Sequence, residues 1–217
     1  MKTLSFQSII FDMDGTLLDS SFAMLQSVNH VRGTLGLEPV SKEFLEYSIN
    51  EPDCDLPMLF YGTKEYVPQH KEAFKQHYLT FANDYIKVYD GVHELLEYLQ
   101  ALHVNISIAT NASDFFAKNM LEHKNLLHYF SHIVGANCVK NPKPNPDMIH
   151  HIATNTQIPL SHTLLVGDSI KDELAAKNAG IAFCFANWGY GVGSAQSSKY
   201  SNIKELLNFL EQHTQRQ

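Results

Sequence analysis

Short apolar runs recur along the chain, and segments with the spacing of amphipathic helices lie between them. The runs cover residues 9–11, 106–109, 133–134, 164–166 and 181–185. Strands of a parallel sheet are buried on both faces, so they read as continuous apolar runs, and parallel strands need helical crossovers between them. The pattern therefore predicts an α/β fold with a Rossmann-like parallel sheet at its core.

Polar residues mark where the connecting helices begin. Asp90 precedes apolar residues at the i, i+3, i+4 and i+7 positions, which predicts an N-cap and an amphipathic helix. Asn145 and Pro146 have the form of a cap followed by a first-turn proline. Asn202 with Glu205 predicts a capped helix near the C-terminal end.

The segment between the first two runs is far longer than a strand-to-helix crossover needs. Residues 17–89 within it have helical spacing, and aromatic residues recur there at Phe74, Tyr78, Phe81 and Tyr85. Such a stripe belongs to a hydrophobic core far more often than to a ligand site. We therefore expect residues 17–89 to form an inserted all-helical domain, and residues 1–16 and 90–217 to form the α/β core.

Composition limits the partners and the compartment. With 217 residues, 44% of them hydrophobic, the chain is large enough for one core and a small inserted domain. A net charge of −7 argues against a nucleic-acid or anionic membrane surface, so a phosphate-bearing ligand would need local cations. Three scattered cysteines, and the lack of an apolar signal or spanning segment, favour a cytoplasmic protein. A monomer and a homodimer are both compatible with these numbers.

Two carboxylates follow the first apolar run, in the stretch Asp12-Met13-Asp14-Gly15-Thr16. Alternate strand residues share a face, so both carboxylates should point into the crevice at the strand ends of an open α/β sheet. They would repel each other unless a cation lies between them. A turn explains Asp14 with Gly15 but leaves Asp12 unexplained, so the stretch predicts a catalytic site.

Polar groups also follow the later runs. Thr110-Asn111 ends the second run, where a hydroxyl and a helix N-terminus suit a phosphate. Lys143 lies in a Lys-Pro-Asn-Pro stretch, whose prolines fix the backbone. Asp168 and Asp172 follow the fourth run, spaced to face one side of a starting helix, and suit Mg²⁺. Each of these residues also has an ordinary interpretation. Thr110 could cap a helix, and Lys143 could be a solvated lysine. Asp168 and Asp172 could complement the dipole at the start of a helix.

Residues 11–20, Phe-Asp-Met-Asp-Gly-Thr-Leu-Leu-Asp-Ser, resemble the first motif of the haloacid dehalogenase superfamily. Thr110, Lys143, and the acidic pair Asp168 and Asp172 match its other three motifs in order. The resemblance implies a Rossmann-like core with the inserted helices as a cap. It further implies that the cap closes over the site and reads the part of the substrate that is not phosphate.

The resemblance also assigns roles to these residues. Asp12 would be the nucleophile, Asp14 the acid and base that serves the leaving oxygen and then water, and Lys143 a cation near the phosphate. Mg²⁺ would bind Asp12, the backbone carbonyl of Asp14, and Asp168, while Asp172 would orient water or a neighbouring ligand. Thr110 with Asn111 would bind the phosphate.

The implied activity is that of a Mg²⁺-dependent phosphatase, which hydrolyses a small phosphorylated metabolite through an aspartyl-phosphate. Relatives that remove halides lack an acid at the position of Asp14, so its presence favours phosphoryl transfer. Two alternatives stay open: a sugar phosphomutase of the β-phosphoglucomutase type, which uses the same motifs, and a non-catalytic binding protein on the same fold.

Two stretches bear on the substrate. Glu51, Asp53 and Asp55 fall where phosphoglycolate-type caps often carry a glycine turn and a basic contact. If they face the site, they favour a neutral or cationic phosphomonoester over phosphoglycolate; otherwise they form a solvated loop. Residues 187–193, Asn-Trp-Gly-Tyr-Gly-Val-Gly, lack the context of a dinucleotide-binding motif and resemble the loop after the last core strand in phosphoglycolate-phosphatase-like members.

Overall fold

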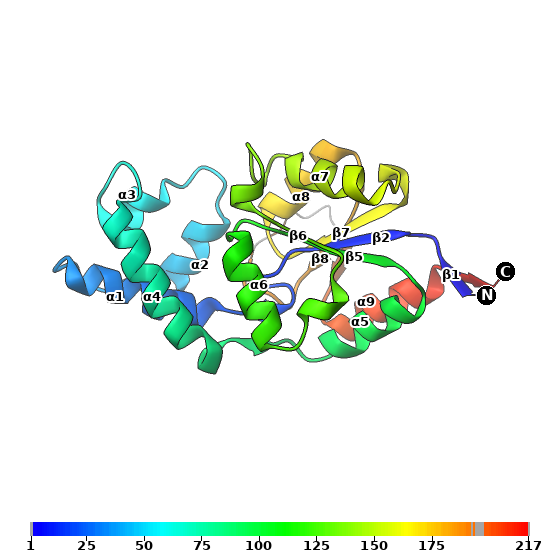
Figure 1. The fold of residues 1–217 in the computed structure, drawn as a ribbon, viewed down its shortest axis with the longest axis horizontal. Coiled ribbons are helices and arrows are strands. Elements are labelled where there is room, and N and C mark those ends of the chain that lie inside the picture. The colour runs from blue at the N-terminus through cyan, green and yellow to red at the C-terminus, as the bar shows by residue number, and fades with distance from the viewer. Residues whose placement is uncertain (1, 192, 194–197, 217) are drawn as a thin grey trace.

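A parallel sheet forms the centre of the computed structural model, which describes residues 2–191, 193 and 198–216 (Figure 1). Within these residues the sheet has six strands in the order β6-β5-β2-β7-β8-β9. All five predicted runs are strands, which confirms the α/β prediction, whereas β9 gave no apolar signal. The strands are β2 (Ser8–Phe11), β5 (Asn105–Thr110), β6 (His132–Gly135), β7 (Thr163–Gly167), β8 (Ala182–Ala186) and β9 (Ser198–Tyr200).

Helices cover both faces of the sheet, which explains why its strands are apolar on both sides. From central strand β2, Ile9 and Phe11 pack on one face and Ile10 on the other. Figure 1 shows α7 and α8 on one side and α5 and α9 on the other. The core helices are α5 (Val92–Ala101), α6 (Asp114–His123), α7 (Asp147–Thr156), α8 (Ile170–Ala179) and α9 (Ile203–Gln212).

Two of the predicted helix caps are wrong. The residue before α5 is Gly91, whose φ of 89° turns the chain in a conformation that suits glycine, so Asp90 lies outside the cap position. Pro146 precedes α7, and the Asn145 side chain instead donates to the carbonyl of Pro142. The Asn202 cap of α9 is confirmed, because its side chain accepts from the backbone N–H of Glu205 at 3.0 Å.

A helical unit leaves the core after β2 and returns before α5. The two connections between the core and this unit, β3 (Leu18–Asp19) and β4 (Lys87–Val88), pair as an antiparallel ribbon. The unit has a hydrophobic cluster of its own, which includes Val28, Leu45 and Phe60. We call residues 17–89 the cap; this boundary stays a prediction, and the ribbon at its two ends supports it. The cap helices are α1 (Ser21–Thr34), α2 (Lys42–Asn50), α3 (Leu56–Tyr61) and α4 (Pro68–Tyr85).

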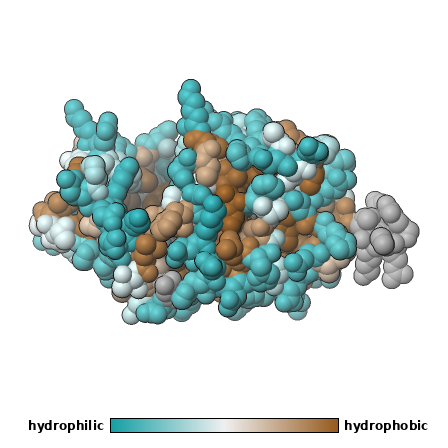
Figure 2. Space-filling view, viewed as in Figure 1, coloured by the Kyte–Doolittle hydropathy of each residue, from teal (hydrophilic) through white to brown (hydrophobic). Residues whose placement is uncertain are grey.

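Smaller elements complete the described fold. β1 (Lys2–Leu4) and β10 (Thr214–Arg216) pair antiparallel and bring the two ends of the chain together. Short 3₁₀ helices are η1 (Leu127–Tyr129), η2 (Ala136–Cys138) and η3 (Leu160–His162). On the face drawn in Figure 2, hydrophilic residues cover most of the helices and hydrophobic residues show between them. Among the described residues, none of the helices combines the length and apolar character that crossing a bilayer requires.

The packing of α9 gives a test of the fold. Leu210→Ala should lower the free energy of unfolding by about 2–5 kcal/mol, because Leu210 is fully buried in the core cluster. Leu37→Ala is the matched control: Leu37 is 38% exposed, so the change should be within about 0.5 kcal/mol. Denaturant unfolding measures both, and equal losses would contradict the packing of α9 into the core.

Candidate active site

The ends of three adjacent strands bring the predicted residues to one edge of the sheet. Asp12 follows β2, Thr110 ends β5 and Asp168 follows β7. The strands are parallel neighbours, so their carboxyl ends open on the same crevice. The backbone N–H of Asp12 donates to the carbonyl of Val166 at 2.8 Å, which extends the β2–β7 pairing to the motif.

Lys143 joins this edge from the loop before α7. Its buried Nζ donates to Asp12 Oδ1 at 2.5 Å, to Asp172 Oδ1 at 2.5 Å and to the carbonyl of Ala109 at 2.6 Å. Burial alone would lower the pKa of Lys143, but attraction to the two carboxylates raises it above its ordinary value. The ammonium therefore keeps its charge throughout the physiological pH range.

Acidic groups outnumber this cation at the site. Burial, reinforced by neighbouring carboxylates and opposed by Lys143, raises the pKa of Asp12 to about 7. Burial is also the main cause that raises the pKa of Asp168 well above its ordinary value, and the pKa of Asp14 is raised in the same way. With Asp172, four carboxylates outnumber the two ammonium groups of the site, Lys143 and Lys171, so the site favours a further cation.

The oxygen donors present fit Mg²⁺. Carboxylate oxygens of Asp12, Asp168 and Asp172 lie within 4.8 Å of one another. Both carboxylate oxygens of Asp172 already accept hydrogen bonds. Lys143 Nζ donates to Oδ1, and the backbone N–H and hydroxyl of Ser169 donate to Oδ2. This leaves Asp12 and Asp168 as the carboxylates for a metal, and hard oxygen ligands of this kind are those that Mg²⁺ prefers.

The predicted placement of the acidic pair on one helix needs correction. Asp168 precedes α8 and lies in the turn after β7, whereas Ser169 is the N-cap and Asp172 the third residue of the helix. Ser169 and Asp172 form a reciprocal capping box. Asp172 therefore caps the helix, as the ordinary reading of a helix-start charge expects, and also accepts a hydrogen bond from Lys143; its role toward water or a neighbouring ligand stays a prediction.

Three glycines, Gly15, Gly189 and Gly191, allow the neighbouring loops to lie directly against Asp168. Gly15 has a φ of 83°, and a Cβ there would overlap the Asp168 carboxylate. A Cβ at Gly191 would overlap the backbone of Asp168, and the Gly191 N–H donates to Asp168 Oδ2 at 2.8 Å. The loop after β8 is thus part of the site, as Trp188 Nε1 also donates to the Thr16 carbonyl at 3.0 Å. Val192 of the predicted 187–193 loop lies outside the described residues.

Sequence analysis missed a hydroxyl network around Asp14. The buried Ser20 hydroxyl donates to Asp14 Oδ1 and lies 3.2 Å from the hydroxyl of Tyr190. Tyr78 of α4 is buried nearby, and the charge of Asp14 adds to burial in raising the pKa of the Tyr78 phenol. Ser20 lies in the stretch that resembles the first motif, so that stretch held a signal for it. Tyr78 was predicted only as part of the aromatic stripe, and Tyr190 only as part of the 187–193 loop.

A cavity of about 840 Å³ opens above these groups, between cap and core. Asp12, Asp14, Thr110, Asn111, Lys143 and Asp168 all contribute to its lining. Phe74 and Tyr78 line it too, so the aromatic stripe of α4 serves both the core and the cavity.

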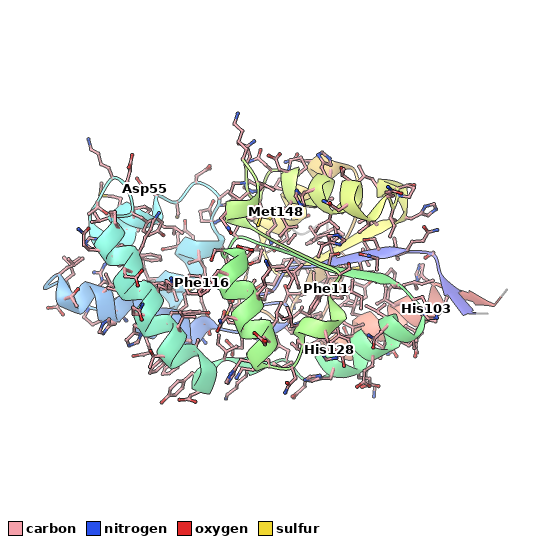
Figure 3. All side chains as sticks on the ribbon, in the orientation of Figure 1. Phe11, Asp55, His103, Phe116, His128 and Met148 are labelled. Carbon is pink, nitrogen blue, oxygen red and sulfur yellow. The ribbon has the colours of Figure 1, made fainter. Side chains whose placement is uncertain are left out.

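The three cap carboxylates do not line this cavity. Lys71, Lys75 and Lys171 do, whereas Asp55 caps α3 by accepting from the Met58 N–H at 3.2 Å. Figure 3 shows Asp55 at the upper edge of the cap, away from Phe116 in α6. Asp53 and Asp55 are exposed, as a solvated loop requires, whereas Glu51 is half-buried and interacts electrostatically with Lys171 of the cavity lining. Since none of the three lines the cavity, they give no reason to prefer a neutral or cationic substrate.

Comparison with known proteins identifies the family. Residues 9–186 match the model of the haloacid dehalogenase-like hydrolases. The chain is 30% identical over 221 residues to a phosphoglycolate phosphatase of Vibrio parahaemolyticus, an alignment that covers 95% of this chain and 97% of that protein. It is 28% identical to a 5′-nucleotidase of Pseudomonas aeruginosa, covering 97% of this chain and 98% of the other.

Solved structures agree with this result. A crystal structure of a predicted phosphoglycolate phosphatase from Haemophilus somnus superposes with a TM-score of 0.80 at 25% identity, covering 94% of this chain and 98% of that one. A predicted phosphatase from Clostridium acetobutylicum gives a TM-score of 0.77 at 22% identity, covering 95% and 99%. The chain belongs to the haloacid dehalogenase-like hydrolases, in their phosphoglycolate-phosphatase-like branch, and is a phosphoric monoester hydrolase. The non-catalytic alternative is thereby set aside.

Metal binding can be tested without turnover. Mg²⁺ should raise the Tm, because a cation relieves the repulsion between Asp12 and Asp168; at a hundred times its Kd, it should stabilise the fold by about 2.7 kcal/mol. Asp168→Asn should lose most of the shift, while Asp53→Asn, in the exposed cap loop, should keep it. Thermal unfolding with Mg²⁺ and with EDTA measures this, and equal shifts in both variants would contradict the assignment.

Proposed function

We propose that the protein is a Mg²⁺-dependent phosphatase that hydrolyses a small phosphomonoester through an aspartyl-phosphate on Asp12. The observation that carries the proposal is the pairing of Asp12 with the buried Lys143 ammonium at the floor of the cavity, next to Asp14. The phosphatase relatives support the same reaction class. The proposed compartment is the cytoplasm, with a monomer or a homodimer as the functional unit.

The reaction uses the two carboxylates of the first motif in turn. A carboxylate oxygen of Asp12 attacks phosphorus, and the bond from phosphorus to the leaving oxygen breaks. Asp14 donates its proton to that oxygen, then takes a proton from the water that attacks the phosphorus of the acyl phosphate. Phosphate leaves, and both side chains return to their starting states. The raised pKa of Asp14 suits this role, because its carboxyl holds a proton closer to neutral pH.

Other groups stabilise the negative charge on the phosphoryl oxygens. Thr110 Oγ1 accepts from the backbone N–H of Ala112 at 3.1 Å, which leaves its own proton to donate to a phosphate oxygen. Asn111 lines the cavity beside Thr110, as a phosphate-binding residue should, and its side chain also donates to the carbonyl of Lys143 at 2.9 Å and so positions that residue. Mg²⁺, held by Asp12, Asp168 and the Asp14 carbonyl, would neutralise charge on the phosphoryl oxygens.

Replacement of the nucleophile gives the direct kinetic test. Asp12→Asn should lower kcat for phosphate release by at least about a thousandfold, because an amide oxygen is a poor nucleophile. Release by the wild type should stop in EDTA, and Asp53→Asn should keep wild-type activity. A loss of less than about tenfold in Asp12→Asn would contradict the assignment. Isomerisation of a sugar phosphate without phosphate release would point to the phosphomutase instead.

The pH profile tests the role of Asp14. The hydroxyl of Ser20 lowers the pKa of Asp14 relative to burial alone, so Ser20→Ala should raise that pKa further. Asp14 must be protonated for the first step, so the alkaline limb of kcat/KM should move to higher pH. Ser27→Ala is a matched control, because Ser27 is equally buried but bonds to Ala23 and His77. A limb that stays in place in both variants would exclude Asp14 as the acid.

A further inference from the structure

The cavity is much larger than the groups that handle phosphate require. Its volume of about 840 Å³ lies within the range of about 300–1,000 Å³ typical of sites for sizeable organic ligands. The catalytic residues occupy the end at the sheet edge. Apolar and aromatic side chains from α1, α3, α4 and α6 line much of the remainder: Met24, Val28, Phe60, Tyr61, Phe74 and Phe116.

The rings of Phe74, Tyr78 and Phe116 connect the cap to the core near Asp14. Phe74 stacks on Tyr78 with ring centroids 5.4 Å apart, and Phe116 of α6 meets Tyr78 edge-on at 5.5 Å. Phe74 and Phe116 are also edge-to-face, at 6.4 Å. The Tyr78 hydroxyl donates a hydrogen bond to Met120 Sδ at 3.1 Å. All three rings line the cavity, and Figure 3 shows Phe116 on α6 at the side that faces the cap.

Two charged side chains of α4 that line the cavity, Lys71 and Lys75, lie over rings, whereas Glu72 accepts a hydrogen bond from the Gln76 side chain at 2.6 Å. Lys71 Nζ lies 5.6 Å from the centre of the Tyr66 ring, and Lys75 Nζ lies 4.9 Å from that of Phe115. An apolar, ring-lined wall offers few hydrogen bonds to a polyol, whose hydroxyls would lose water without full compensation. It offers edge-to-face partners to a flat ring instead.

We propose that the preferred substrate is a phosphomonoester whose leaving alcohol carries an aromatic or heteroaromatic ring, seated among Phe74, Tyr78 and Phe116. This inference rests on the proposed function, because it places the phosphate at Asp12 and the leaving oxygen at Asp14. The ring then extends from the leaving oxygen into the part of the cavity shared by α4 and α6.

Three synthetic esters separate size from ring character. Ethyl, 2-cyclohexylethyl and 2-phenylethyl phosphate share the same primary-alcohol linkage, so their leaving oxygens are similar in reactivity. The kcat/KM for 2-phenylethyl phosphate should exceed that for ethyl phosphate by about tenfold or more, and should also exceed that for the cyclohexyl ester. A nucleoside 5′-monophosphate, also a primary ester, should likewise exceed ethyl phosphate.

Variants tie the preference to the three rings. Phe74→Leu and Phe116→Leu keep apolar volume but remove one ring, so each should lower the phenyl-to-cyclohexyl ratio of kcat/KM by about threefold to tenfold. Phe22→Leu is the matched control, because Phe22 is an aromatic residue of the cap that contacts Phe81 and Tyr85 and does not line the cavity. It should leave the ratio unchanged.

The outcomes distinguish the two proposals. Mg²⁺-dependent hydrolysis that needs Asp12 but shows no preference for either large ester overturns the inference and leaves the proposed function intact. Equal kcat/KM for the cyclohexyl and phenyl esters overturns the assignment of a ring. Failure to release phosphate from any ester overturns the proposed function, and the inference with it.

Discussion

The buried ammonium of Lys143 is the interaction on which the rest of the site depends. It binds Asp12 after β2, Asp172 in α8 and the Ala109 carbonyl of β5, so it links three elements that lie far apart in the sequence. A charge buried in this way stays only if several partners compensate it, and removing one partner leaves the others uncompensated. The position of Lys143 therefore fixes the orientation of both carboxylates.

The same arrangement makes the site incomplete without a ligand. The ammonium groups of Lys143 and Lys171 cannot together neutralise the four carboxylates of Asp12, Asp14, Asp168 and Asp172. Burial keeps the pKa values of the first three carboxylates raised. Backbone N–H groups of Tyr190 and Gly191 donate to Asp168 and offset part of the excess negative charge. A divalent cation and a phosphoryl group would bring the remaining charges into balance, which is why a site so unfavourable in isolation suits phosphoryl transfer.

Local patterns predicted the central sheet and most of the site. Five of the six strands have an apolar run of their own, and Asp12, Thr110 and Asp168 each lie at the end of one of these five, so position along the chain was enough to place them. Contacts between distant elements were not accessible in this way: the ring contacts of Tyr78 depend on how α4 meets α6. Two misses were local instead. Gly91, next to Asp90, takes the N-cap position of α5, and Asp55 caps α3 through the backbone N–H of Met58, three residues further on.

The covalent intermediate on Asp12 is the central claim of this account. Rapid acid quenching during turnover of a phosphomonoester with Mg²⁺, followed by peptide mass analysis, tests it most directly. We expect the peptide containing Asp12 to gain the mass of one phosphoryl group during turnover. This group should disappear once substrate is exhausted and should never form in Asp12→Asn. A phosphoryl group on another residue, or rapid turnover with none on the protein, would contradict that claim.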